Sequence, residues 1–414
     1  MATAAARAAD KLLREPALVI GSAPPDARDL DLLVRAGARD ELAAALRADG
    51  FEDLAGMLVR LAECGCEAVE LIPAEDWGLP AEELDALFGE GVPLAGHQRL
   101  LLPAPHHVLL ILARRYVTDL RGVLDEKRRA RVASATEADP GAWKTAAARA
   151  GAWGARDALE RLRGAYEDGR EPPLALRARR RLRRPRRGTL VTLSGLDGSG
   201  KSSQAEALQK ALDVLGYDAV VVWTSLVAHP ALGAAGEPVK RLLRRLRRVS
   251  PPSAAEGWAQ PADAPSSDPG RALRQRSAVL TQVWATYVAL VNAWWQARAT
   301  TPQLARGRVV ICDRWTLDSK VQMRYQYGAE RGFGFQARLV RLLSPRPARA
   351  FLLDISAGEA VRRKPEYTLE QNERRRSLYL ADHVRLGVDR LDGERPQDEL
   401  CAEIARAVAK TLEK

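Results

Sequence analysis

The sequence predicts an α/β protein. Its carboxy-terminal part is expected to be a three-layer sandwich around a parallel sheet, preceded by an α+β module with a helical extension. The chain has 414 residues, too many for one ordinary core, so two domains are expected. Strand-like and helix-like segments alternate from residue 189 onward, which is typical of parallel sheets. A glycine-rich turn joins the first of these strands to a helix.

That turn, residues 195–202, reads Gly-Leu-Asp-Gly-Ser-Gly-Lys-Ser and is a complete phosphate-binding P-loop pattern. Residues 189–194 predict a buried strand before it, and residues 201–215 predict the helix after it. Glycines allow close approach of the main chain, and a helix start attracts anions, so we expect ATP phosphates here. Lys201 would reach the β/γ-phosphates and the Ser202 hydroxyl would ligate Mg²⁺. The expected nucleotide-binding residues are Gly195, Asp197, Gly198, Ser199, Gly200, Lys201, Ser202 and Ser203.

Composition argues against a membrane protein. The longest apolar run lies near residues 108–113, far short of a membrane span. Residues 1–10 are alanine-rich without a secretory core, so we expect a cytoplasmic protein. Cys64 and Cys66 have no second pair that would complete a zinc site, so reduced thiols are expected.

The net charge of +11 is concentrated in two runs. Residues 177–187 contain eight arginines and no acid, and residues 240–248 contain six basic residues and no acid. We expect a solvated linker and a solvated helix face. Nucleic-acid binding through Arg177–Arg187 is the alternative.

The amino-terminal module begins with strand-like residues 17–20, the turn Gly21-Ser22 and a second strand at 29–34. Residues two apart share one face of a strand, so Asp29 and Asp31 can hold one divalent metal. The alternative is an exposed strand with two surface aspartates.

The Gly-Ser turn followed by Asp-x-Asp resembles the nucleotidyltransferase superfamily of the polymerase-β type. This resemblance implies a third carboxylate on a neighbouring strand and two Mg²⁺ ions for in-line attack on an α-phosphate. Residues 66–72 supply the candidate strand, with Glu70 as first choice and Glu67 as second. Arg28 stands where that family usually has serine, so a scaffold without activity is the alternative.

Further helices are expected in this module, and they end in a linker. His106 and His107 start one of these helices, and because neighbouring residues point apart we expect packing or capping, with metal contact as the alternative. We expect residues 1–173 to form the first domain, the arginine-rich 174–188 a linker, and 189–414 the second domain. The helices are expected at residues 38–48, 81–88, 105–120, 121–132 and 140–167.

In the second domain, strands are expected at residues 217–223, 308–312, 350–355 and 387–391. Helices are expected at 238–248, 271–299 and 397–412, and the Pro- and Ser-rich residues 250–270 predict a mobile loop. Ligands bind parallel sheets at the carboxyl ends of strands. The glycine-rich turn and Asp313-Arg314 both occupy such ends.

The second domain resembles thymidylate kinases and their close relatives over most of residues 187–414. The resemblance implies transfer of the γ-phosphoryl group of ATP to a nucleoside monophosphate, with Mg²⁺ bound. Its matching stretches are residues 195–202, Val309–Arg314 with Trp315 and Ser319, Phe351–Ile355 with Arg362 and Arg363 after it, Arg374–Tyr379, and Leu391–Pro396.

This resemblance also implies residue roles. Asp313 would hold the metal shell or the acceptor's sugar hydroxyl, and Arg314 would clamp the acceptor phosphate. The turn lacks an arginine, so Arg362, Arg363 or Lys364 in a lid would stabilise the transition state. A buried ion pair at Asp313-Arg314 and an exposed lid face are the structural alternatives.

The acceptor side departs from the family. Residues 222–225 read Val-Trp-Thr-Ser where an Arg-Glu-Pro is usual, and residues 280–295 contain no arginine. The acceptor is therefore thymidylate or another nucleotide. A kinase for nucleic-acid 5′ ends or another large acceptor, and a non-catalytic ATP-binding regulatory module, are the alternatives. The sequence is compatible with a homodimer.

Overall fold

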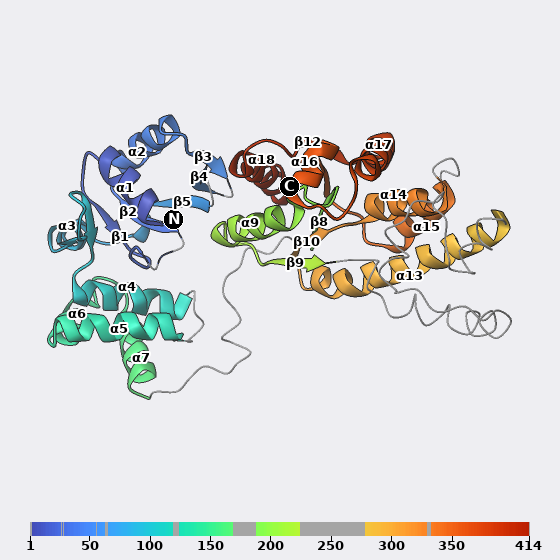
Figure 1. Ribbon diagram of the computed structural model, residues 1–414. Helices are drawn as coiled ribbons and strands as arrows, with labels where there is room; N and C mark the ends of the chain where they lie inside the picture. Colours follow the sequence, from blue (N-terminus) through green and yellow to red (C-terminus); the bar gives the residue numbers. More distant parts are fainter. Residues whose placement is uncertain are drawn as a thin grey trace. The chain divides into compact units, whose positions relative to one another are not determined.

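The computed structural model divides into two compact units, Met1–Leu182 (unit 1) and Arg183–Lys414 (unit 2), which are described separately (Figure 1). It describes residues 2–25, 27, 29–54, 56–62, 65–118, 124–168, 188–223, 278–328 and 333–413. Several sequence features lie outside these residues: Arg28, Cys64, the Arg177–Arg187 run, the basic residues 240–248 and the loop 250–270.

Unit 1 is built on a seven-stranded mixed sheet of order β3-β4-β5-β2-β1-β7-β6. The pairs β2–β5 and β1–β7 are parallel, and the other neighbours are antiparallel. The strands are β1 (Ala17–Val19), β2 (Leu30–Val34), β3 (Glu52–Leu54), β4 (Met57–Ala62), β5 (Gly65–Pro73), β6 (Val92–Pro93) and β7 (Leu100–Leu102).

Alternation along these strands gives unit 1 two hydrophobic cores. Val19, Leu30 and Leu32 pack on one face with α1 (Ala2–Leu12) and α2 (Ala36–Ala48). Leu18 and Leu33 pack on the other face with a helical layer, visible in Figure 1. That core contains residues of α3 (Ala81–Gly89), α4 (Pro105–Thr118), α5 (Glu126–Ala138), α6 (Ala142–Arg149) and α7 (Arg156–Glu167); η1 (Glu75–Trp77) follows β5.

The helices of unit 1 differ from expectation in three ways: one has other bounds, one is divided in two and one was not expected. The helix expected at 121–132 corresponds to α5, which the Asp125 carboxylate caps by accepting from the Arg128 backbone N–H and which continues to Ala138; residues 119–123 lie outside the described residues. The single helix expected at 140–167 is two helices, with Gly154 at a φ of +58° in the break. Helix α1 was not expected, because its alanines carry little hydrophobic signal.

Unit 2 contains a five-stranded sheet of order β12-β11-β8-β10-β9, in which every pair is parallel. This confirms the parallel α/β architecture expected from the alternation of segments. The strands are β8 (Thr189–Gly195), β9 (Ala219–Trp223), β10 (Val309–Asp313), β11 (Arg349–Asp354) and β12 (Asp389–Asp392). The chain crosses from β10 to β11, past the central strand β8, so its direction of winding reverses beside β8.

Helices connect these strands, and Figure 1 shows α9 beside α18 and α13 beside α15. Three of them, α14, α15 and α17, were not expected, because buried polar residues interrupt their apolar periodicity. None of the helices in the described part of the chain is both long and apolar enough to cross a bilayer. The helices are α9 (Lys201–Val214), α13 (Ala278–Ala305), α14 (Thr316–Tyr327), α15 (Gly334–Leu343), α16 (Ala357–Arg363), α17 (Leu369–Leu386) and α18 (Gln397–Leu412).

Candidate active site

The glycine-rich turn lies between β8 and α9, and its three glycines have backbone angles that favour glycine. Their φ values are +147° at Gly195, +86° at Gly198 and +84° at Gly200. A Cβ on Gly195 would lie 2.5 Å from the Leu353 carbonyl oxygen, so the main chain passes too close to β11 for a side chain. The turn is therefore a main-chain cradle at the carboxyl end of the central strand.

Lys201, the first residue of α9, points its ammonium group into this cradle. Its Nζ donates to the carbonyl oxygens of Gly195 at 3.0 Å and Leu196 at 2.7 Å. Burial lowers the pKa of Lys201, and the neighbouring Arg314 lowers it further. Ser199 is buried beside the ammonium, whereas Ser203 faces solvent.

Ser202 connects the turn to the neighbouring strand. Its hydroxyl donates a hydrogen bond of 2.7 Å to Asp313 Oδ2, at the end of β10. The parallel register places Asp313 beside Leu193 of β8, so both groups reach the same edge of the sheet. A hydroxyl and a carboxylate in contact are oxygen ligands suited to Mg²⁺.

Asp197 lies between two guanidinium groups. It accepts from Arg314 Nη2, and its other oxygen accepts from Arg375 Nη1 at 3.1 Å. Burial alone would raise the pKa of Asp197, but Arg314, Arg375 and Lys201 outweigh it and lower the pKa to about 2. The Asp197 carboxylate therefore stays ionised between cations, and it holds Arg314 and Arg375 at one place on this edge of the sheet.

Arg375 was missed by the sequence analysis as a site residue. Its side chain is 2% exposed, and its guanidinium lies 4.3 Å from the ring centroid of Tyr367. A buried, stacked arginine at this edge of the sheet is a group whose geometry is fixed by its own packing. The only sequence signal was the run of three arginines at 374–376, in which the register of α17 decides which one points inward.

Arg314 has a φ of +74°, an uncommon value for a residue with a side chain. Its backbone N–H donates to the Leu193 carbonyl oxygen at 2.9 Å, which holds this conformation against β8. Such backbone strain concentrates at functional sites. The turn directs the Arg314 side chain toward Asp197 rather than along the strand.

Asp318, also missed from the sequence, joins three parts of the site. Its carboxylate accepts from the Ser194 hydroxyl at 2.7 Å, the Tyr379 hydroxyl at 2.8 Å and the Trp315 backbone N–H at 2.9 Å. These partners belong to β8, to α17 and to the start of α14. The buried network fixes the glycine-rich turn relative to the helix that carries Arg375.

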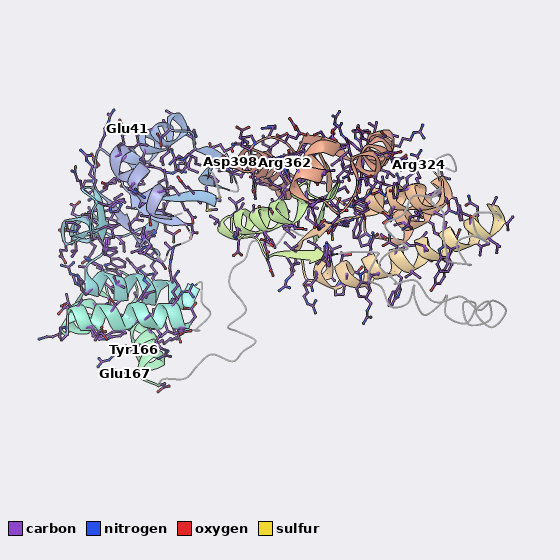
Figure 2. The ribbon with its side chains drawn as sticks, in the orientation of Figure 1. Glu41, Tyr166, Glu167, Arg324, Arg362 and Asp398 are labelled. Carbon is purple, nitrogen blue, oxygen red and sulfur yellow. The ribbon has the colours of Figure 1, made fainter. Side chains whose placement is uncertain are left out.

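The two lid arginines differ in their surroundings. Glu359 accepts from Arg362 Nε at 2.7 Å and from Arg363 Nε at 2.5 Å. Arg362, labelled in Figure 2, is 74% exposed, whereas Arg363 is 32% exposed. A Cβ placed on Gly198 would lie 3.3 Å from the Arg363 Cβ and 3.4 Å from the Lys364 Cβ, so these two residues border the turn.

Comparison with known proteins decides the family. The "Probable thymidylate kinase" of Pyrococcus abyssi is 30% identical over 178 residues, which are 43% of this chain and 70% of that protein. The "Thymidylate kinase" of Rhizorhabdus wittichii is 30% identical over 191 residues, 45% of this chain and 74% of that protein. The chain belongs to the thymidylate kinase family.

A third relative, the "Thymidylate kinase" of Ruegeria pomeroyi, is 26% identical over 239 residues, 54% of this chain and 96% of that protein. No family model matches the chain. As a thymidylate kinase family member, the chain departs from the expected acceptor side at 222–225, of which the structure describes residues 222 and 223. Residues 280–295 of α13 contain no arginine, as noted from the sequence.

In unit 1, the structure brings together the three acids selected from the sequence. Asp31 of β2 and Glu70 of β5 are direct register partners on adjacent parallel strands. Burial raises the pKa of Asp31 to about 6, and the nearby carboxylates of Asp29 and Glu70 add to the increase. A Cβ on Gly21 would clash with the Asp31 carboxylate, so any larger residue there would require this side chain to move.

Two cations from the helical layer act on the same cluster. Arg115 of α4 and Arg131 of α5 both lower the pKa of Asp31, and Arg131 Nη2 donates to the Ile20 carbonyl oxygen at 3.1 Å. Burial lowers the pKa of Arg131 to about 10. Carboxylates that can hold metal therefore lie beside guanidinium groups that can hold phosphate.

Glu67, the second choice for the third carboxylate, was wrong. It is paired in register with Arg60 of β4, and Arg60 Nη2 lies 2.7 Å from Glu67 Oε2. Glu67 and Glu70 are three residues apart on one strand and therefore point to opposite faces.

Proposed function

We propose that unit 2 transfers the γ-phosphoryl group of ATP to a nucleoside monophosphate, as the family's name suggests. One observation carries the proposal: the glycine-rich turn meets Asp313 and Arg314 at the same edge of the sheet through the Ser202–Asp313 hydrogen bond of 2.7 Å. A phosphate donor held by the turn would then face an acceptor held near Arg314. Phosphoryl transfer depends mainly on such positioning and on charge neutralisation.

The residues of the turn would hold the donor. Backbone N–H groups at the start of α9 would bind phosphate oxygens, and Lys201 would exchange its contacts with two carbonyl oxygens for contacts with the β/γ-phosphates. Ser202 and Asp313 would hold Mg²⁺, which supplies positive charge to the phosphate oxygens when bound. Arg363, at the border of the turn, would approach the transferred group.

The acceptor's phosphate would bind Arg314 and Arg375. Asp197 holds both guanidinium groups, so we assign it the role of positioning them rather than of binding ATP phosphates. Arg375 comes from α17, and it supplies a second arginine where α13 has none between 280 and 295. An arginine from α17 in place of one from α13 supports an acceptor that carries negative charge. It does not indicate which base the acceptor has.

The test is ADP release coupled to a chromogenic reaction, across the common nucleoside monophosphates. Wild-type protein should turn over with at least one monophosphate, and Lys201→Ala should lose about 10² or more in kcat, because one phosphate-neutralising charge is removed. Lys210→Ala is the matched control, since Lys210 is the exposed lysine of the same helix. ATP binding without acceptor-dependent turnover would defeat the kinase proposal in favour of a regulatory module.

A polyanionic acceptor is distinguished by salt. If the arginine run at 177–187 held a nucleic-acid 5′ end, the KM for an oligonucleotide should rise steeply with ionic strength. A monophosphate acceptor contacted by two arginines predicts a much shallower dependence. Arg177–Arg187 lies outside the described residues, so only the assay bears on this alternative.

We also propose a second activity, nucleotidyl transfer by unit 1. The register pairing of Asp31 with Glu70, with Asp29 nearby, supports a metal-dependent site of three carboxylates. The doubly substituted Asp29→Asn, Asp31→Asn protein should lose any Mg²⁺- or Mn²⁺-dependent transfer from labelled nucleoside triphosphates, whereas Asp40→Asn, at an exposed position of α2, should retain it. Absence of transfer by the wild-type protein would make unit 1 a scaffold.

A further inference from the structure

A second group of potential ligands lies elsewhere in unit 1, where α3, α4 and α6 meet. His106 and His107 begin α4 and are both buried, as the sequence analysis expected of packing residues. Glu90, the residue that follows α3, brings its Oε2 to 3.0 Å from His106 Nε2. Arg149, the last residue of α6, donates to Glu90 Oε1 at 2.6 Å and lies 3.1 Å from His107 Nε2.

The three side chains have the geometry of a metal-binding set. One ligand atom from each of Glu90, His106 and His107 can be chosen so that all lie within 4.8 Å of one another. His107 has no exposed surface, and its Nδ1 is buried without a hydrogen-bond partner in the part of the chain that the structure describes. A buried polar atom without a partner is destabilising, and a bound ion or water is a common partner for such an atom.

We propose that Glu90, His106 and His107 form a binding site for a divalent transition metal of the zinc type, separate from the three carboxylates at Asp31. Two imidazoles and one carboxylate are a ligand set that zinc and its neighbours accept, with a further position for water. Glu90 is 38% exposed and gives the ion a route from solvent. The bound ion would join the end of α3 to the start of α4.

Arg149 makes the proposal sharply testable, because its contact with His107 and metal binding at His107 exclude each other. If the metal takes Nε2, it replaces the Arg149 donor directly. If it takes Nδ1, the ring proton moves to Nε2, which then meets Arg149 as donor against donor. In both cases the guanidinium must leave, and at 28% exposure its side chain has access to solvent.

An aromatic contact also holds the His107 ring in place. Its ring stacks on Trp153, with centroids 5.8 Å apart, and Trp153 Nε1 donates to Glu83 Oε2 at 2.9 Å. Stacking holds the ring plane, so rotation of the imidazole is restricted while Arg149 remains free to move. The imidazole that would ligate the ion is therefore held in one orientation by its neighbours.

The experiment is titration of the EDTA-treated full-length protein with Co²⁺, followed by visible absorption. Wild-type protein should show a saturable band without the near-ultraviolet charge-transfer band that cysteine ligands would give. Glu90→Gln and His106→Gln should each lose that band and one bound equivalent. Arg149→Ala should bind Co²⁺ at least about tenfold more tightly, since the ion no longer breaks two arginine hydrogen bonds.

Arg163→Ala is the matched control for Arg149→Ala, because it removes an exposed arginine from α7 in the same unit. Its Co²⁺ affinity should equal that of the wild type. Unchanged stoichiometry in both ligand variants, with circular dichroism showing folded protein, would overturn the proposal. So would an Arg149→Ala protein that is folded and binds no more tightly than Arg163→Ala. Should Arg149→Ala not fold, Glu90→Gln and His106→Gln decide the question alone.

Discussion

The Ser202 hydroxyl donates a hydrogen bond of 2.7 Å to the Asp313 carboxylate, across a sequence separation of 111 residues. This contact joins the glycine-rich turn to the end of the adjacent strand. It exists because β8 and β10 are parallel neighbours in register, so that their carboxyl ends coincide. The proposed Mg²⁺ site depends on this pairing more than on either residue alone.

Asp313→Asn should therefore weaken the use of Mg²⁺ rather than the affinity for the acceptor. We expect the Mg²⁺ concentration for half-maximal activity to rise about tenfold or more, because an amide is a weaker ligand for a hard cation than a carboxylate. Titration of activity with Mg²⁺ at saturating ATP measures it. Ser377→Ala, which removes an exposed hydroxyl of α17, should behave as the wild type. Equal Mg²⁺ dependence in Asp313→Asn and wild type would contradict the assignment.

Arg363 and Arg362 should have unequal effects on kcat. Arg363 borders the turn at Gly198, whereas Arg362 is 74% exposed. We expect Arg363→Gln to lower kcat about 10³-fold, as loss of a transition-state arginine does, and Arg362→Gln to change it less than about threefold. Single-turnover measurements with saturating substrates compare the two directly. Equal losses in both variants would mean that the lid presents either arginine.

Arg375→Gln should raise the KM for the acceptor with little effect on the KM for ATP. The side chain is buried against Tyr367 and reaches Asp197, on the acceptor side of the turn. Loss of a charge-assisted contact of about 1.5–3 kcal/mol corresponds to roughly a 10- to 150-fold change in affinity. Arg385→Gln, at an exposed position of the same helix, is the control. An increase in the KM for ATP alone would place Arg375 on the donor side instead.

Asp31→Asn should stabilise unit 1 at neutral pH. Burial and the neighbouring acids raise the pKa of Asp31 to about 6 from 3.8, so the folded protein holds this proton more tightly than the unfolded chain. The free energy of unfolding of the wild type should therefore fall as the pH rises through this interval. The variant stays neutral and should exceed the wild type by up to about 3 kcal/mol near pH 8 but match it near pH 4.

Urea unfolding with EDTA present, at both pH values, measures this difference. Asp40→Asn should match the wild type at both, since Asp40 lies at an exposed position. A gain in stability at pH 8 together with a loss of metal binding is expected if the buried charge of Asp31 serves function and destabilises the fold. No difference at either pH would show that Asp31 ionises without cost.

The sequence alone predicted the parallel sheet of unit 2 and the two strand ends that the structure brings together at one edge of it. Local signals were sufficient there, because the glycines stand at a fixed spacing and the strands are rich in β-branched residues. Helices such as α14 and α17 were missed, because their buried polar residues, Asp318 and Arg375 among them, hide the apolar periodicity. Arg375 could not be separated from Arg374 and Arg376 without the helix register, which packing sets.

The amino-acid sequence thus determined which chemical groups are present: a glycine-rich turn, an Asp-Arg pair at the end of one strand, and paired aspartates at the start of another. Only the tertiary structure decided which groups meet. In the folded chain, Asp197 contacts two arginines, and Arg149 lies between Glu90 and His107. The alternation of side chains along β5 puts Glu70, and not Glu67, beside Asp31. The physical reason is that charge and hydrogen bonding act over a few ångströms, and strand register and helix packing set those distances between residues far apart in the chain.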